Sequence, residues 1–192
     1  MNQLPKEIIK LIFEDCDLKT LINLSVLSKK YLKSVQKIIF NEHEVNFNVN
    51  IKMYDIKKIM KLRCNKDMKD EDLNNLTHIT HLNLNKNNQI TYGIKKLTNL
   101  TYLNLGDNKC VVNYCICQLN KLTHLNLGSN KYITDEGIKN LHNLKILYLG
   151  SNKHITNEGI KNLHNLIDVN LGFNTNITYD DLLYSGYQNF FN

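Results

Sequence analysis

Three cysteines in one short segment are the residues of this chain whose chemistry must be considered first. Cys110, Cys115 and Cys117 fall within residues 110–117, and cysteine thiolates bind zinc or act as nucleophiles. A structural zinc site normally takes four ligands in paired Cys or His spacings, and the sequence offers no second pair. We therefore expect no metal site and interpret the segment as a substituted loop. The five cysteines in all have no framework spacing, which favours free thiols in a reducing compartment.

Catalytic groups are equally hard to assemble from the sequence. A Ser-His-Asp or Cys-His set needs its members within hydrogen-bonding reach, whereas this chain repeats the same residue types at fixed intervals. Cys117 is the one candidate nucleophile by position, and that role would require an exposed thiolate. No GxGxxG or P-loop pattern occurs. We expect no catalytic residues, no cofactor and no enzymatic activity.

The overall composition indicates a globular protein. The chain has 192 residues and 42% hydrophobic content, which is enough to form a continuous core. It contains no run of about 20 apolar residues and no basic-then-apolar leader. The net charge of +6 is spread along the chain without a block of like charges. We expect an intracellular protein, cytoplasmic or nuclear, that binds neither membrane nor nucleic acid.

A 22-residue repeat determines where the functional side chains of this chain lie. The phrase LxxLxx(L/V)xLxxN begins at Leu97, Leu119, Leu141 and Leu163. A unit from Leu76 is one residue shorter, and a weaker unit begins at Ile56, which makes six units. The Leu-x-Leu stretch predicts a strand with its leucines inward. The following Ile-Thr-Asp-Glu-Gly-Ile-Lys phrase predicts one helical or 3₁₀ turn with Thr134 as its cap. One unit cannot bury its own leucines, so the units must stack into a solenoid.

This pattern resembles the leucine-rich repeat over roughly residues 56–183. The resemblance implies an α/β fold, a short solenoid with a parallel concave sheet, with repeats at about 56–185 of a 45–192 domain. It also implies that one recurrent asparagine per unit satisfies backbone groups of the neighbouring turns. These residues are Asn87, Asn108, Asn130, Asn152 and Asn174. The alternation of apolar and polar residues over 45–53 predicts a half-buried capping strand that joins the first repeat and shields the sheet edge.

The first 44 residues do not follow the repeat and predict three short amphipathic helices. They form too small a core to be stable alone, so they must pack against something else. The stretch Leu4-Pro5-Lys6-Glu7-Ile8 and the later Leu27-Ser28-Lys29-Lys30-Tyr31 resemble the two motif halves of an F-box. That family binds the Skp-type adaptor of cullin ubiquitin ligases. By this likeness the adaptor-binding residues are Leu4, Pro5, Ile8, Ile12, Leu21, Leu27, Ser28 and Tyr31.

The outward-facing strand positions can be assigned from the repeat alone. They flank the inward leucines and are expected to line the concave sheet, where rings with polar tips suit a binding face. The partner-binding candidates are His81, Asn83, Tyr102, Asn104, His124, Asn126, Tyr148, Asp168 and Asn170. His81 and His124 lie two units apart, which is too far for one shared metal ion.

The two resemblances together imply a substrate-recognition adaptor of a cullin-type ubiquitin ligase, a monomer within a hetero-complex that binds an unknown target protein. One alternative is a free-standing interaction or decoy module whose N-terminal helices only cap the solenoid. Another is a repeat-bearing ubiquitin ligase with Cys117 as its own catalytic thiol. The sequence distinguishes neither a viral from a cellular origin nor degradation of the target from its sequestration; a viral protein would act in the host cell.

Overall fold

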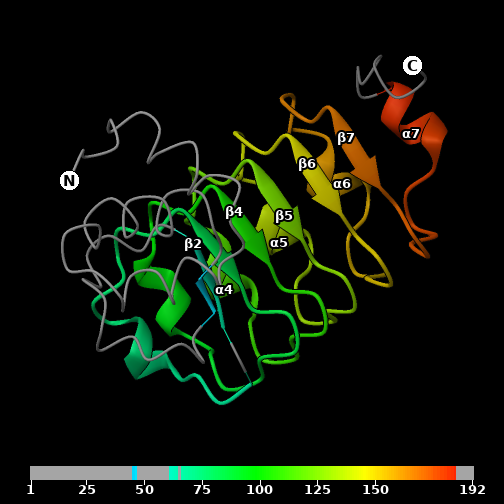
Figure 1. Cartoon of the computed structure of the whole chain (residues 1–192). Coiled ribbons are helices and arrows are strands. Elements are labelled where there is room, and N and C mark those ends of the chain that lie inside the picture. Colours follow the sequence, from blue (N-terminus) through cyan, green and yellow to red (C-terminus); the bar gives the residue numbers. More distant parts are fainter. Residues whose placement is uncertain (1–44, 47–60, 65, 185–192) are drawn as a thin grey trace, which may run out of the picture.

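The leucine spacing produces one parallel sheet of very short strands. The computed structural model describes residues 45–46, 61–64 and 66–184. Seven strands pair in chain order from β1 to β7, and every pairing is parallel. Figure 1 shows them side by side as a curved array, with the return helices on the opposite side of each turn. The predicted α/β leucine-rich-repeat solenoid is therefore confirmed.

Each described repeat contributes a strand, a tight turn and a short return helix. The strands are β1 (Val45–Asn46), β2 (Lys61–Arg63), β3 (His81–Asn83), β4 (Tyr102–Asn104), β5 (His124–Asn126), β6 (Ile146–Tyr148) and β7 (Asp168–Asn170). The return segments are the 3₁₀ helices η3 (Asp70–Leu73) and η4 (Gly93–Lys96), and the α-helices α4 (Asn113–Ile116), α5 (Asp135–Ile138), α6 (Asn157–Ile160) and α7 (Tyr179–Tyr184). The switch from period two to a helical spacing explains this alternation.

The core runs along the solenoid between the sheet and the return helices. Leu103, Leu125 and Leu147 point into it from consecutive strands, and Ile138 and Ile160 enter it from the return helices, all with about 1% exposure or less. Because each unit buries its leucines only against its neighbours, stability comes from stacking rather than from any single repeat.

The sheet begins where the alternating segment ahead of the repeats was expected to join it. Val45 pairs with Leu62 and Asn46 with Arg63 in parallel register. Residues 47–60 of the predicted capping strand and of the first repeat lie outside the described residues. The seventh strand thus comes from the segment that precedes the six repeats.

The recurrent asparagines form the predicted ladder. The Nδ2 group of Asn130 donates to the carbonyl oxygens of Asn108 and Val111, both at 3.1 Å. Its Oδ1 accepts from the amides of Tyr132 at 2.8 Å and Ile133 at 2.9 Å. Asn152 and Asn174 make the same four bonds one and two units later. Each side-chain amide thus satisfies backbone groups of its own turn and of the preceding one, from a buried position.

A column of glycines lets consecutive turns approach closely after each strand. Gly128, Gly150 and Gly172 have φ values of +47°, +55° and +54°, in the left-handed region that side chains with a Cβ rarely adopt. A Cβ on Gly150 would lie 2.6 Å from the carbonyl oxygen of Gly128. The glycines are therefore required both by the backbone conformation and by the tight stacking of the turns.

The predicted capping role of Thr134 needs a correction. Thr134 occupies the N-cap position of α5, but its side chain accepts no bond from that helix. Its hydroxyl instead accepts from Asn113 Nδ2 at 2.8 Å, and its amide donates to Asn113 Oδ1 at 2.8 Å. Thr156, one unit later, does accept from the Glu158 amide. The partner of Thr134 is therefore Asn113, one unit earlier, and not an amide of its own helix.

Candidate partner-binding face

The strand register arranges the outward side chains in two rows, which together we call the concave face. The first row holds Lys61, His81, Tyr102, His124, Ile146 and Asp168. The second row holds Arg63, Asn83, Asn104, Asn126, Tyr148 and Asn170. Neighbouring strands lie about 4.8 Å apart, so six strands give rows about 24 Å long. All nine residues predicted from the repeat to be partner-binding lie in these rows.

Three rings lie next to one another along the first row, the first two stacked and the third tilted. His81 and Tyr102 are stacked with ring centroids 5.6 Å apart, and Tyr102 and His124 follow at 6.2 Å. Thr123 Oγ1 lies 3.0 Å from the Thr101 carbonyl oxygen and 2.8 Å from His124 Nδ1. When the single hydroxyl proton goes to the carbonyl, Nδ1 must donate and Nε2 is left as an acceptor. The stack therefore offers a partner both apolar ring area and a hydrogen-bond acceptor.

The far end of the face carries a polar pair. The hydroxyl of Tyr148 on β6 donates to Asp168 Oδ2 on β7 at 3.3 Å. Tyr148 is 39% exposed, so its ring is open to a partner. The negative charge of Asp168, together with slight burial, raises the pKa of the Tyr148 hydroxyl.

One predicted binding residue is less accessible than the repeat indicated. Asn83 is in register with Asn104 on the concave face but is only 8% exposed. Its Oδ1 accepts from the amide of Asn85 at 3.0 Å, a role that Asn104 and Asn170 also perform for Gly106 and Gly172. Asn83 therefore acts mainly in the turn and offers a partner little surface.

Two face residues were missed from the sequence. Lys61 and Arg63 flank Leu62 on β2 and pair with His81 and Asn83. Their signal was the Lys-Leu-Arg stretch within the weak unit that begins at Ile56, which has the same outward, inward, outward order as the later strands. The concave face is therefore basic at β2 and acidic at β7.

Two neighbouring repeats show where the sequence was free to vary. Residues 122–143 and 144–165 differ at only five aligned positions. These are Thr123/Lys145, His124/Ile146, Asn126/Tyr148, Tyr132/His154 and Asp135/Asn157. Two of the five are the outward positions of the strand, while every core leucine and ladder asparagine is retained. The scaffold is thus kept while its concave face is changed, as a recognition surface requires.

The cysteine segment forms no metal centre. Cys115 is 2% exposed, and burial raises the pKa of its thiol. The sulfurs of Cys110 and Cys117 lie near the carbonyl oxygens of Asn88 and Tyr114. Within residues 61–64 and 66–184, no group of three or more Cys, His, Asp or Glu side chains could hold a metal ion.

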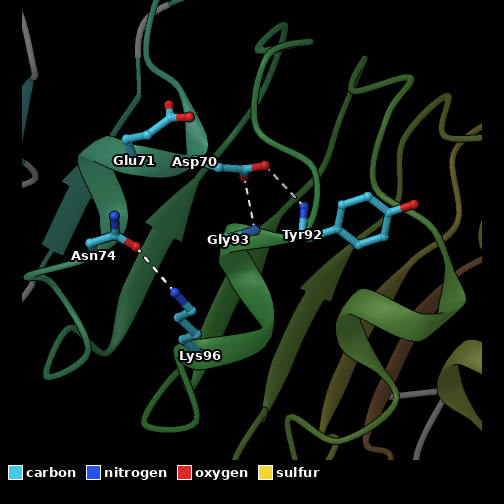
Figure 2. Close-up of a pocket in the computed structure, with 6 residues that line it drawn as sticks. All are labelled: Asp70, Glu71, Asn74, Tyr92, Gly93 and Lys96. Carbon is cyan, nitrogen blue, oxygen red and sulfur yellow. Dashed lines mark hydrogen bonds between the residues drawn. The ribbon is translucent and has the colours of Figure 1, made fainter.

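A shallow pocket lies between the first two return helices, on the side away from the concave face. It is lined by Asp70, Glu71, Asn74, Tyr92, Gly93 and Lys96 (Figure 2). Asp70 accepts from the Thr91 amide at 2.9 Å, the Thr91 hydroxyl at 2.6 Å and the Gly93 amide at 2.8 Å. Partial burial acts to raise the pKa of Asp70, but the bonds from Thr91, Gly93 and Tyr92 outweigh it and the pKa is lowered. The Asp70 carboxylate already accepts its hydrogen bonds from the next repeat. We therefore interpret the residues of this pocket as a contact between two repeats and not as a ligand-binding site.

The lowered pKa of Asp70 predicts a pH-dependent contribution to stability. A depressed carboxyl pKa stabilises the fold above the unfolded-state value, near 3.9, and that stabilisation is lost as the pH falls through the folded-state value. We expect Asp70→Ala to lower the free energy of unfolding by about 1 kcal/mol at pH 7, after allowance for solvent screening. The difference from wild type should shrink near pH 2.5 in urea titrations. Glu71→Ala is the matched control, and an equal loss in both variants would contradict the assignment.

The eight residues predicted to contact the adaptor all lie outside the described residues. Their role remains a prediction. In the part of the chain that the structure describes, no helix combines the length and apolarity needed to cross a bilayer.

Sequence families match both parts of the chain. Residues 1–43 match the F-box domain, and residues 75–93, 96–111, 118–141 and 140–163 match the leucine-rich repeat. Both resemblances found in the sequence are therefore confirmed. No curated protein matches the chain.

The chain is similar to several solved structures. The internalin InlF of Listeria monocytogenes is 24% identical with a TM-score of 0.57, over 80% of this chain and 48% of the internalin. Internalin C2 of the same organism is 24% identical with a TM-score of 0.47, over 77% of this chain and 75% of that one. A leucine-rich-repeat protein of Leptospira interrogans is 24% identical with a TM-score of 0.41, over 62% and 38%. The chain spans about half the length of InlF, and the likeness concerns the fold alone.

Proposed function

Since this chain is an F-box protein with leucine-rich repeats, we propose that it is a substrate-recognition adaptor of a cullin-type ubiquitin ligase. F-box and leucine-rich-repeat domains are typically non-enzymatic interaction modules, and F-box domains typically bind Skp-type adaptors. In this role residues 1–43 hold the Skp-type adaptor, and the concave face holds a target protein. Other subunits supply the chemistry, and the protein acts as a monomer within the complex, in the cytoplasm or nucleus.

The observation that carries the proposal is the presence, in one chain, of a segment that matches the F-box domain and a sheet face whose outward residues differ between repeats. The concave face has a row of neighbouring rings that includes Tyr102, and it has an exposed tyrosine, Tyr148. Tyrosine is among the residue types that dominate binding energy at protein interfaces. Its length of about 24 Å suits a helix or an extended segment. Constant scaffold positions and changed outward positions are what recognition of a particular target requires.

The direct test is complex formation between two purified proteins. The full chain is mixed with a Skp-type adaptor at about 10 μM each. At this concentration even a complex with a dissociation constant of about 1 μM is mostly formed. Size-exclusion chromatography with light scattering should then give a species with one copy of each. A Tyr102→Ala/Tyr148→Ala variant should form the same species, because these residues belong to the other proposed interface. Absence of the complex for both chains would favour a free-standing interaction or decoy module.

A further inference from the structure

We propose that the concave face selects its protein partner through a basic side chain, a lysine or arginine, that pairs with Asp168 and lies against the ring of Tyr148. This inference rests on the proposed function in one respect: it assumes that the concave face is the partner-binding surface. It goes beyond that function in stating which chemistry the face recognises.

Asp168 is the one acidic side chain in the two rows, on a protein of net charge +6. The cations of the rows, Lys61 and Arg63, stand at the opposite end on β2, five strand spacings or about 24 Å away. That separation exceeds the screening length of about 8–10 Å at physiological salt. Asp168 forms no ion pair with a lysine or arginine of the described residues, although its amide donates to the carbonyl oxygen of the exposed Lys145 at 3.1 Å. The carboxylate is therefore not paired with a cation of the two rows and is available to a partner.

Tyr148 completes the site beside this carboxylate. Its hydroxyl donates to Asp168 Oδ2 at 3.3 Å, which fixes the ring next to the negative charge while 39% of the residue stays exposed. A lysine or arginine could pair with Asp168 while its cation or its alkyl stem lies against the exposed ring. The raised pKa of the Tyr148 hydroxyl is consistent with an uncompensated negative charge there.

A basic side chain fits this pair better than a metal ion does. One carboxylate and one phenol provide too few oxygen ligands for Ca²⁺ or Mg²⁺, and no metal-binding cluster occurs among the described residues. The preceding unit offers no equivalent pair, because Asn126 and Ile146 stand where Tyr148 and Asp168 stand one strand later. The cation preference is thus confined to the β6–β7 end, and the rings of His81, Tyr102 and His124 would contact the apolar part of the same segment.

The experiment uses the full chain as bait for a phage-displayed library of random peptides. Wild type should enrich peptides with a lysine or arginine at one aligned position, followed by aromatic or aliphatic residues. Replacing that basic residue by methionine should weaken binding of a synthetic peptide about tenfold, as loss of one close charge pair does. Asp168→Asn should remove the enrichment, and Asp168→Lys should replace it with aspartate or glutamate.

Asp107→Lys is the matched control, because Asp107 is an exposed acid outside the two rows. It should leave the selected peptides unchanged. Enrichment without a basic position, a basic preference that survives in Asp168→Lys, or no enrichment at all would overturn the inference. Adaptor binding by the same variants is measured separately. If wild type did not bind the adaptor, the adaptor role would be refuted while the peptide result would still stand. The two failures are therefore distinguishable.

Discussion

Replacing Asn130 by alanine will lower the free energy of unfolding by about 4 kcal/mol or more, because it removes four hydrogen bonds made by a buried side chain. The Asn130 side chain is 0% exposed. Its loss strands the amides of Tyr132 and Ile133 and the carbonyl oxygens of Asn108 and Val111. Each buried polar group left without a partner costs about 1–3 kcal/mol. Since the fold is stabilised by contacts between neighbouring units, this loss weakens the junction between the third and fourth described turns.

Urea titration followed by circular dichroism measures the change. Asn140→Ala is the matched control, because Asn140 is exposed and lies in the following return segment of the same repeat. We expect that control to stay within about 0.5 kcal/mol of wild type, as surface substitutions usually do. If the two alanine variants lost equal stability, the ladder would not be what joins the units.

The fold could be predicted from the sequence because each structurally required residue recurs at the same position in several repeats. Leu125 and Leu147 had to be inward and His124 and Ile146 outward for the units to stack, and the register places them so. The asparagine ladder could be predicted for the same reason, since a tight buried turn leaves amides and carbonyls that need a partner. Such requirements are local to one unit and are visible in its spacing.

Features that depend on contacts between particular neighbours were harder to predict. Asn113 lies one unit before Thr134 and forms hydrogen bonds with both the hydroxyl and the amide of Thr134. The prediction that Thr134 caps its own helix failed for this reason. Asp70 and Asp135 likewise accept hydrogen bonds from the amide and the hydroxyl of Thr91 and Thr156, respectively. The signal was an acidic or amide residue about 21 positions before each threonine, and it could be read only once the stacking distance was known. The low exposure of Asn83 likewise depends on its surroundings and not on its place in the repeat.

A chain carrying Leu4→Ala, Pro5→Ala and Ile8→Ala should bind a Skp-type adaptor at least about 100-fold more weakly than wild type. These residues fall in the stretch that matches the opening of the F-box domain. Truncation of a central apolar contact typically costs 1–2 kcal/mol or more, so three such losses exceed about 3 kcal/mol, which is over a hundredfold in affinity. Isothermal titration calorimetry with the purified adaptor gives the ratio directly.

Lys6→Ala/Lys10→Ala is the control for the change in that stretch, because these lysines lie between the apolar positions of the predicted helix. We expect its affinity to fall less than about threefold, as charges at an interface rim contribute little. A Leu4→Ala/Pro5→Ala variant, which leaves Ile8 in place, separates loss of contact from loss of the helix. The solenoid should keep its unfolding midpoint in all three variants. Full adaptor binding by the triple variant would mean that Leu4, Pro5 and Ile8 do not form the adaptor contact. Absence of adaptor binding by wild type itself would mean that these helices serve the solenoid alone.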